Sequence, residues 1–175
     1  MVWVIVAIVA VIIGIPGSIW VIGQLLPKGH SVTRSAVLPA PPDRVWAVIT
    51  DFASEATWNR AVTESHRIED RNGHEVWMTA DRRGGKMPLE TVEAVPMKKL
   101  VRKIADPKLP FGGQWTVTLA AEGSGTKLSV TEDGEVYNPF FRFFARYFMN
   151  PAASIEAYVS GLAKQFSAAG PAGQR

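Results

Sequence analysis

The first 27 residues contain no aspartate, glutamate, lysine or arginine, and 20 of them are hydrophobic. A helix over 25 of these residues would be about 37 Å long, which exceeds the roughly 30 Å hydrocarbon core of a bilayer. Gly14, Pro16 and Gly17 interrupt the apolar stretch and predict a kink after Ile12. We therefore expect residues 1–27 to form a transmembrane anchor helix.

A cleaved signal peptide is the alternative for this segment, but a basic stretch before the apolar run and a small-x-small cleavage site are both missing. Trp3 and Trp20 carry amphipathic rings suited to the membrane interface, and the basic residue Lys28 is expected at the same interface. Lys28, Arg34 and Arg44 all follow the apolar run. The positive-inside rule then predicts a single-pass protein with its amino terminus outside and its domain in the cytoplasm.

All 19 Lys and Arg residues and all 16 Asp and Glu residues follow this segment, and the chain has no cysteine. The remaining length is typical of one globular domain and is sufficient for a core without metals or disulfides. We expect a domain over residues 28–169 and a flexible tail over residues 170–175. A polytopic transporter, a disordered protein and a disulfide scaffold are excluded.

Period-two patterns separated by Gly, Pro and Asn turns predict seven strands in this domain. They cover residues 31–38, 62–68, 74–80, 88–95, 100–105, 113–120 and 127–136. Two short helices are expected after the first strand, from Pro42 and over 53–58. A long helix from Pro139 should bend or restart at Pro151. We predict an α+β fold of order β-α-α-β6-α, in which a seven-stranded antiparallel sheet wraps around the carboxy-terminal helix and leaves a cavity.

Several short motifs in the domain resemble those of one known superfamily. They are Val37-Leu-Pro-Ala-Pro-Pro-Asp-Arg-Val-Trp46, Trp58-Asn59, Phe111-Gly-Gly-Gln-Trp115, Gly125-Thr-Lys-Leu128, and Thr131-Glu-Asp-Gly-Glu-Val136 before Asn138-Pro139. The domain resembles the helix-grip fold of the START-like (SRPBCC) superfamily, and its polyketide cyclase/dehydrase-like branch in particular. The resemblance implies an internal cavity, and it leaves the reaction or ligand open.

Two carboxylates are candidates for polar groups in that cavity. Glu132 shares its strand face with Leu128 and Val130, so it is expected to point toward the cavity as an acid/base or as an anchor for a polar ligand group. The alternative is a solvent-facing position near the strand end. Glu90 is a weaker candidate, with a solvated strand face as its alternative.

Aromatic residues supply the expected walls of the cavity, because small-molecule pockets combine apolar surfaces with a few polar groups. Ordinary core packing is the alternative for each of them. The candidates, with Asn59 as a polar group at the mouth, are Trp58, Trp77, Trp115, Tyr137, Phe140, Phe144 and Tyr158.

The segment 139–149 contains six aromatic residues, too many for one face of a helix. Arg142 and Arg146 are four residues apart and therefore share a side of it. In an anchored protein the surplus aromatics would lie at the bilayer interface, with both arginines on lipid phosphates. Packing against the sheet and the short helices is the alternative.

Nothing in the sequence indicates a metal, a cofactor or a nucleic-acid partner. The three histidines have no ligand spacing, and no nucleotide-binding motif is present. The basic pairs Arg82-Arg83, Lys98-Lys99 and Arg102-Lys103 are interpreted as solvated strand and turn positions. We expect binding of a hydrophobic small molecule or lipid. The alternatives are a cyclase/dehydratase-like enzyme with Glu132 as its catalytic residue and an interaction module with a filled core.

Overall fold

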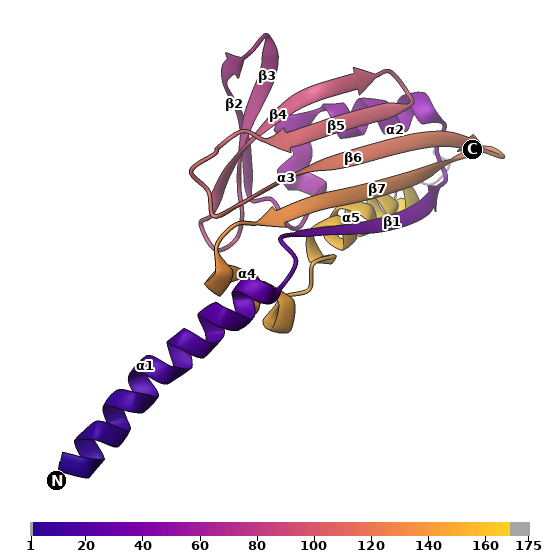
Figure 1. Ribbon diagram of the computed structural model, residues 1–175. Helices are drawn as coiled ribbons and strands as arrows, with labels where there is room; N and C mark the ends of the chain where they lie inside the picture. Colours follow the sequence, from indigo (N-terminus) through magenta and orange to yellow (C-terminus); the bar gives the residue numbers. More distant parts are fainter. Residues whose placement is uncertain (1, 169–175) are drawn as a thin grey trace.

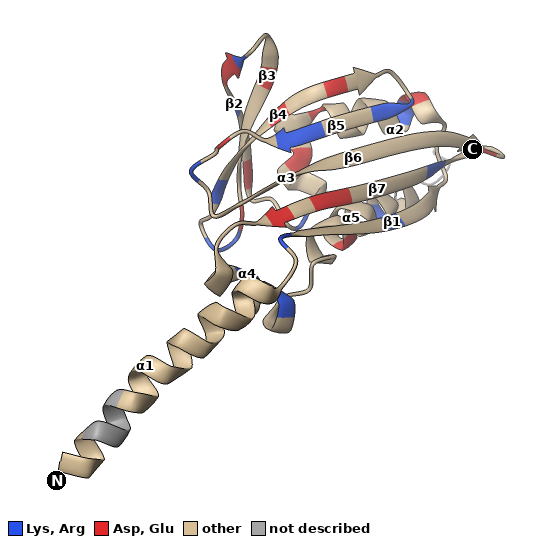
Figure 2. Ribbon diagram, in the orientation of Figure 1, with Lys and Arg blue, Asp and Glu red and all other residues tan. Residues whose placement is uncertain are grey.

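The computed structural model describes residues 2–168, with the side chains of residues 6–9 excepted. Helix α1, Val2–Leu25, projects from a globular domain (Figure 1). It is free of charged residues where it is described, whereas both signs of charge are spread over the domain (Figure 2). Its mean hydropathy of 2.7 and its length are compatible with a membrane span and with a signal sequence.

Pro16 lies inside α1, yet the helix is continuous and straight, so the expected kink after Ile12 is wrong (Figure 1). A proline removes one backbone donor, and that loss is tolerated where the neighbouring turns keep their hydrogen bonds. The hydroxyl of Ser18 also donates to the carbonyl oxygen of Gly14 over 2.8 Å.

The domain is built on one antiparallel sheet of seven strands in the order β1-β7-β6-β5-β4-β3-β2. The meander from β2 to β7 follows the short turns of the sequence, and β1 closes it by pairing with β7. The α+β fold predicted from the sequence is confirmed. The strands are β1 Gly29–Leu38, β2 Glu64–Arg71, β3 His74–Ala80, β4 Lys86–Val95, β5 Lys99–Ile104, β6 Phe111–Glu122 and β7 Gly125–Val136.

Helices cover one face of this sheet (Figure 1). Helix α2, Pro42–Thr50, begins with proline at its first turn, as expected from the missing N–H. It is followed by the 3-10 turn η1, Phe52–Ser54, and by α3, Glu55–Trp58. The carboxy-terminal segment is two helices, α4 Pro139–Phe148 and α5 Ala153–Ala168, and the break spans Pro151 as the sequence predicts. The expected tail, 170–175, lies outside the described residues.

The apolar core lies between the sheet and these helices. Leu38 and Leu128 from the sheet are fully buried, and so are Val45 of α2 and Leu162 of α5. Gly161 of α5 permits a close approach to α3, because a Cβ atom there would overlap the backbone carbonyl oxygen of Trp58. Helices α3 and α5 therefore meet in close backbone contact at this point.

Candidate functional site

A row of side chains crosses the helix-covered face of the sheet. Strand register pairs Thr91 with Arg102, Arg102 with Trp115, and Trp115 with Glu132. Directly opposed residues of neighbouring strands lie on the same face, so these four side chains share it. Two polar groups, Arg102 and Glu132, thus lie on the interior face with a tryptophan between them.

Arg102 forms a buried ion pair with Glu55 of α3. Its Nη1 donates to Glu55 Oε2 over 3.1 Å, and both side chains are almost fully excluded from solvent. Glu55 Oε1 accepts a second hydrogen bond from Nδ2 of Asn59, at 2.8 Å. The guanidinium carbon also lies 3.9 Å from the ring centre of Phe52. This cluster fixes the arginine in the interior between β5 and the short helices.

Several buried donors in this region have no hydrogen-bond acceptor among the described residues. They are Nε and Nη2 of Arg102, Nε1 of Trp58 and the hydroxyl of Thr91. Buried polar groups are normally paired, and leaving one unpaired costs about 1–3 kcal/mol. The arrangement is therefore suited to a molecule that brings oxygen acceptors into the interior.

Tyr158 of α5 lies against this cluster, with its ring centre 4.9 Å from that of Trp58 in an edge-to-face arrangement. Burial raises the pKa of Tyr158 above its ordinary value of 10.0, and the carboxylate of Glu55 raises that pKa further. The guanidinium of Arg102 acts on the same pKa in the opposite direction. The phenol is therefore neutral throughout the physiological range.

Because the buried phenol stays neutral, the stability of the domain should fall as the pH rises above 10. Above pH 10 the unfolded chain loses the Tyr158 proton and the folded chain keeps it, so the unfolding free energy falls by up to about 1.4 kcal/mol per pH unit. We expect Tyr158→Phe to make this fall shallower above pH 10 and to leave the pH dependence of the unfolding free energy below pH 10 unchanged. Denaturant titrations of both proteins between neutral pH and pH 11 measure the difference, and parallel curves would contradict the assignment.

Glu132 lies at the other end of the row, half-enclosed between the sheet and α5. Its Oε2 accepts hydrogen bonds from Nε1 of Trp115, at 2.8 Å, and from the hydroxyl of Ser154. Its Oε1 lies 3.5 Å from Nε2 of His30 on β1. The structure thus places Glu132 on the helix-covered face of the sheet, as the strand parity in the sequence predicts. The carboxylate is hydrogen-bonded to β6 and α5, and it lies beside β1.

The remaining predicted cavity residues divide between the interior and the surface. Trp77 packs edge-on against Phe52, with ring centres 5.7 Å apart. Glu90 lies on the opposite face of β4 from Thr91, and its Oε1 contacts Nδ1 of His74 at 2.8 Å. The structure therefore does not bring Glu90 to the interior.

Three predicted wall residues near the carboxy-terminal helices are exposed. Tyr137 precedes α4, and Phe140 and Phe144 lie on it, with large fractions of their surface open to solvent. All three lie on the outer surface at or just before α4 and are not brought to the interior cluster. Trp58, Trp115, Tyr158 and Asn59 are the predicted residues that lie with Trp77 and Glu132 between sheet and helices.

Sequence reasoning missed the ion pair, and it placed Arg102 in solvent. A signal for its burial exists, because Arg102 is two residues from both Leu100 and Ile104 and therefore shares their strand face. Glu55 and Trp58 are likewise at helical spacing on α3, and Asn59 directly follows that helix. The neighbouring lysines Lys98, Lys99 and Lys103 make the segment around Arg102 resemble a solvent-exposed basic stretch.

A second arginine, Arg142, departs from the expectation that it meets lipid phosphates. It is only 4% exposed, and it donates to four backbone carbonyl oxygens. The buried guanidinium therefore binds carbonyl oxygens of the protein itself, two of which lie at the carboxy-terminal end of α1. Arg146 remains exposed on α4.

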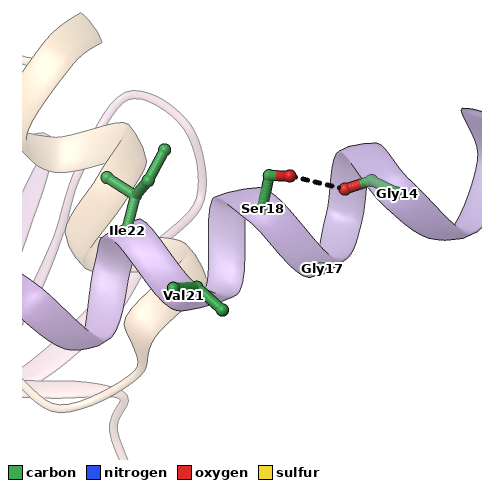
Figure 3. Close-up of a pocket in the computed structure, with 5 residues that line it drawn as sticks. All are labelled: Gly14, Gly17, Ser18, Val21 and Ile22. Atoms are coloured by element: carbon green, nitrogen blue, oxygen red, sulfur yellow. Dashed lines mark hydrogen bonds between the residues drawn. The ribbon is translucent and has the colours of Figure 1, made fainter.

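An open hollow of about 560 Å³ lies on α1, away from the interior cluster (Figure 3). It is lined by Gly14, Gly17, Ser18, Val21 and Ile22. The two glycines have no side chains to fill the helix surface, and a Cβ at either would meet nothing. This hollow is a surface feature of the apolar helix. Among the described histidines and acidic residues, no group of three or more is arranged to hold a metal ion.

Comparisons with known proteins agree on the fold. Residues 29–166 match the family described as "Polyketide cyclase / dehydrase and lipid transport". A START superfamily protein from Mycobacterium smegmatis is similar at a TM-score of 0.64 and 15% identity, over 80% of this chain and 99% of that one. The Zhui aromatase/cyclase from a Streptomyces species is similar at a TM-score of 0.66 and 14% identity, over 82% and 97%.

One domain of a larger protein is also similar. The di-domain aromatase/cyclase StfQ of the steffimycin biosynthetic pathway matches at a TM-score of 0.62 and 14% identity, over 81% of this chain and 52% of that one. No curated relative matches the sequence. At these identities the solved structures establish the START-like helix-grip fold and nothing beyond it.

Proposed function

The chain belongs to the polyketide cyclase/dehydrase and lipid transport family, and from this premise we propose that it is a membrane-anchored, ligand-binding START-like domain. The proposed ligand is a hydrophobic small molecule or lipid, held between the sheet and α5. The proposed anchor is α1, with the domain over residues 28–169 on the cytoplasmic side, which the basic residues after α1 favour.

The observation that carries the proposal is the set of unpaired donors around Arg102. Two nitrogens of Arg102, Nε and Nη2, are unpaired, and Trp58 and Thr91 add one unpaired donor each among the described side chains. A ligand oxygen at this position would remove the cost of leaving these groups unpaired. The surrounding Phe52, Trp77 and Trp115 supply the apolar surface that small-molecule sites require.

The charge balance of the cluster indicates which oxygens the ligand carries. Glu55 already neutralises Arg102, so a second carboxylate brought by a ligand would meet the buried charge of Glu55. Carbonyl and hydroxyl oxygens accept hydrogen bonds without adding charge. The supported ligand is therefore an uncharged, mostly apolar molecule with carbonyl or hydroxyl groups.

The proposal is tested with two matched probes, a dihydroxyanthraquinone and anthracene, which share three fused rings and differ in their oxygens. Binding to the full chain in detergent is followed through quenching of tryptophan fluorescence. The double variant E55Q/R102M keeps an acceptor for Asn59 but removes both charges and the arginine donors. We expect it to weaken anthraquinone binding at least about tenfold, because hydrogen bonds to charged groups contribute about 1.5–3 kcal/mol.

Anthracene binding should change little in the same variant, since anthracene makes no hydrogen bonds. Equal affinities of the wild type and the variant for the anthraquinone would count against Arg102 as the ligand contact. Absence of binding by both probes would favour an interaction module with a filled core.

A second candidate function, a cyclase-type acid–base reaction, is favoured by the Glu132 cluster. The carboxylate and the imidazole of His30 lie 3.5 Å apart, and Ser154 and Trp115 hold the carboxylate in place. Such a pair can exchange a proton with a bound substrate. Turnover of a poly-β-keto substrate mimic by the wild type and its loss in Glu132→Gln would support this reading over binding alone.

A further inference from the structure

Arg142 joins α4 to the end of the proposed anchor. The last carbonyls of a helix lack intrahelical donors and carry the negative end of its dipole, and α1 has no basic residue in its own last turn. Nη1 of Arg142 donates to the carbonyl oxygens of Gly23 and Leu26, at 2.9 and 3.1 Å. Its other nitrogens donate to Val136 and Tyr137, each at 3.1 Å. One buried cation thus ties α1, α4 and the end of β7 together.

Gly23 completes this joint through close backbone packing. A Cβ atom at Gly23 would overlap the carbonyl group of Pro139, the first residue of α4. Asn138 fixes the same end of α4, because its side chain accepts from the backbone N–H groups of Phe140 and Phe141. The start of α4 is therefore held against the domain end of α1, and in Figure 1 α4 passes behind that end.

The outer surface of α4 is aromatic and uncovered. Phe148 is 73% exposed, and the other large apolar residues exposed on or directly after α4 are Phe140, Phe141, Phe144, Tyr147 and Met149. Phe143 packs against Phe144, Tyr147 and Phe148, which makes one contiguous aromatic surface. A patch of this kind on a soluble surface marks an interaction site.

We propose that α4 is an interfacial helix, whose aromatic surface lies in the headgroup region of the bilayer that α1 crosses. The proposal rests on the proposed anchoring by α1. A helix of 24 residues is about 36 Å long, so its end emerges at the interface, and the Arg142 joint holds α4 at that depth. Exposed Trp20 lies at the same end of α1, and exposed Arg146 is available to lipid phosphates.

Embedding α4 also brings the interior site close to the bilayer. The turn after α4 leads into α5, whose Ser154 contacts Glu132 in the interior layer. An embedded α4 would hold this end of the sheet–helix layer against the lipid.

The absence of cysteine allows a clean test with single nitroxide labels on the full chain. Labels at Ile12→Cys, Phe148→Cys and Val37→Cys replace three exposed apolar residues, on α1, on α4 and at the far end of β1. The protein is reconstituted in vesicles of phosphatidylcholine and phosphatidylglycerol. Collision rates with oxygen and with a water-soluble nickel complex give the depth of each label, and near-ultraviolet circular dichroism checks that each variant is folded.

We expect the Ile12 label in the hydrocarbon core, the Val37 label in water, and the Phe148 label about 5–10 Å below the membrane surface. Arg142→Gln should shift the label toward water when it is added to Phe148→Cys, and it should leave the label in the core when it is added to Ile12→Cys. A Phe148 label as water-exposed as the Val37 label, with Ile12 in the core, would overturn the interfacial helix and leave the anchor standing.

Two other results are separable from that one. A water-exposed Ile12 label would overturn the anchor, and the interfacial helix with it. Shielding of the Phe148 label from both reagents, together with dipolar broadening between labels, would mean that a second copy of the chain covers α4, which also overturns the proposal.

Discussion

Glu55→Ala is expected to lower the unfolding free energy by about 3–5 kcal/mol, because it leaves the charge of Arg102 buried without a partner. The carboxylate is the counter-ion that Arg102 has in the interior among the described residues. It is also the acceptor for Nδ2 of Asn59, which would lose its hydrogen bond as well. Denaturant titration of the full chain in detergent, followed by tryptophan fluorescence, measures the loss.

The double variant E55Q/R102M is the matched control for this effect. Replacing a buried ion pair by residues of similar volume without charge is often neutral or stabilising. The double variant should therefore be much more stable than Glu55→Ala, although it lacks the same carboxylate. A Glu55→Ala loss below about 1 kcal/mol would mean that the pair behaves like an exposed salt bridge.

Gly161→Ala is expected to destabilise the domain by about 2 kcal/mol, although alanine favours helices over glycine by about 1 kcal/mol. The added Cβ would meet the backbone carbonyl oxygen of Trp58. A backbone atom cannot rotate away as a flexible side chain can, so α5 must move off α3. This movement would also separate Tyr158 from Trp58 and weaken probe binding.

Ser160→Ala supplies the control for Gly161, because Ser160 is the preceding residue of α5 and is exposed. Its hydroxyl only donates to the carbonyl of Ala157 on the same helix. We expect this change to be neutral or slightly stabilising in the same titration. Equal and small effects at both positions would show that α5 and α3 are not closely packed.

The fold was predictable because its signals are local. Period-two alternation and turn residues gave all seven strands, with ends within a few residues of those observed. Pro42 and Pro151 marked a helix start and a helix break for a covalent reason, the missing N–H. Pro16 misled because its effect depends on the hydrogen bonds around it, which in α1 keep the helix straight.

The site was predictable only where strand parity decides. Glu132 was assigned to the interior face from Leu128 and Val130, and its side chain lies there. Arg102 was interpreted as solvated because it stands among lysines, although the same parity argument applies to it. Its partner Glu55 lies 47 residues away on another element, and pairing at that distance depends on the tertiary fold.

The arginines of α4 also show that a sequence pattern alone does not distinguish a buried side chain from an exposed one. Composition marked 139–149 as too aromatic for one helix face, and the exposed rings agree with that count. Arg142 and Arg146 were treated alike because they share a helix side. The tertiary fold distinguishes them, since the carbonyl oxygens of Gly23 and Leu26, together with those of Val136 and Tyr137, take Arg142 out of solvent.

Native mass spectrometry of the full chain in mild detergent tests the central claim of an oxygen-bearing ligand at Arg102 most directly. The account predicts that the wild type carries a hydrophobic small molecule or lipid as a discrete added mass, and that E55Q/R102M loses most of it while remaining folded. A wild-type chain without added mass, or a variant that retains the same molecule in the same proportion, would contradict the account.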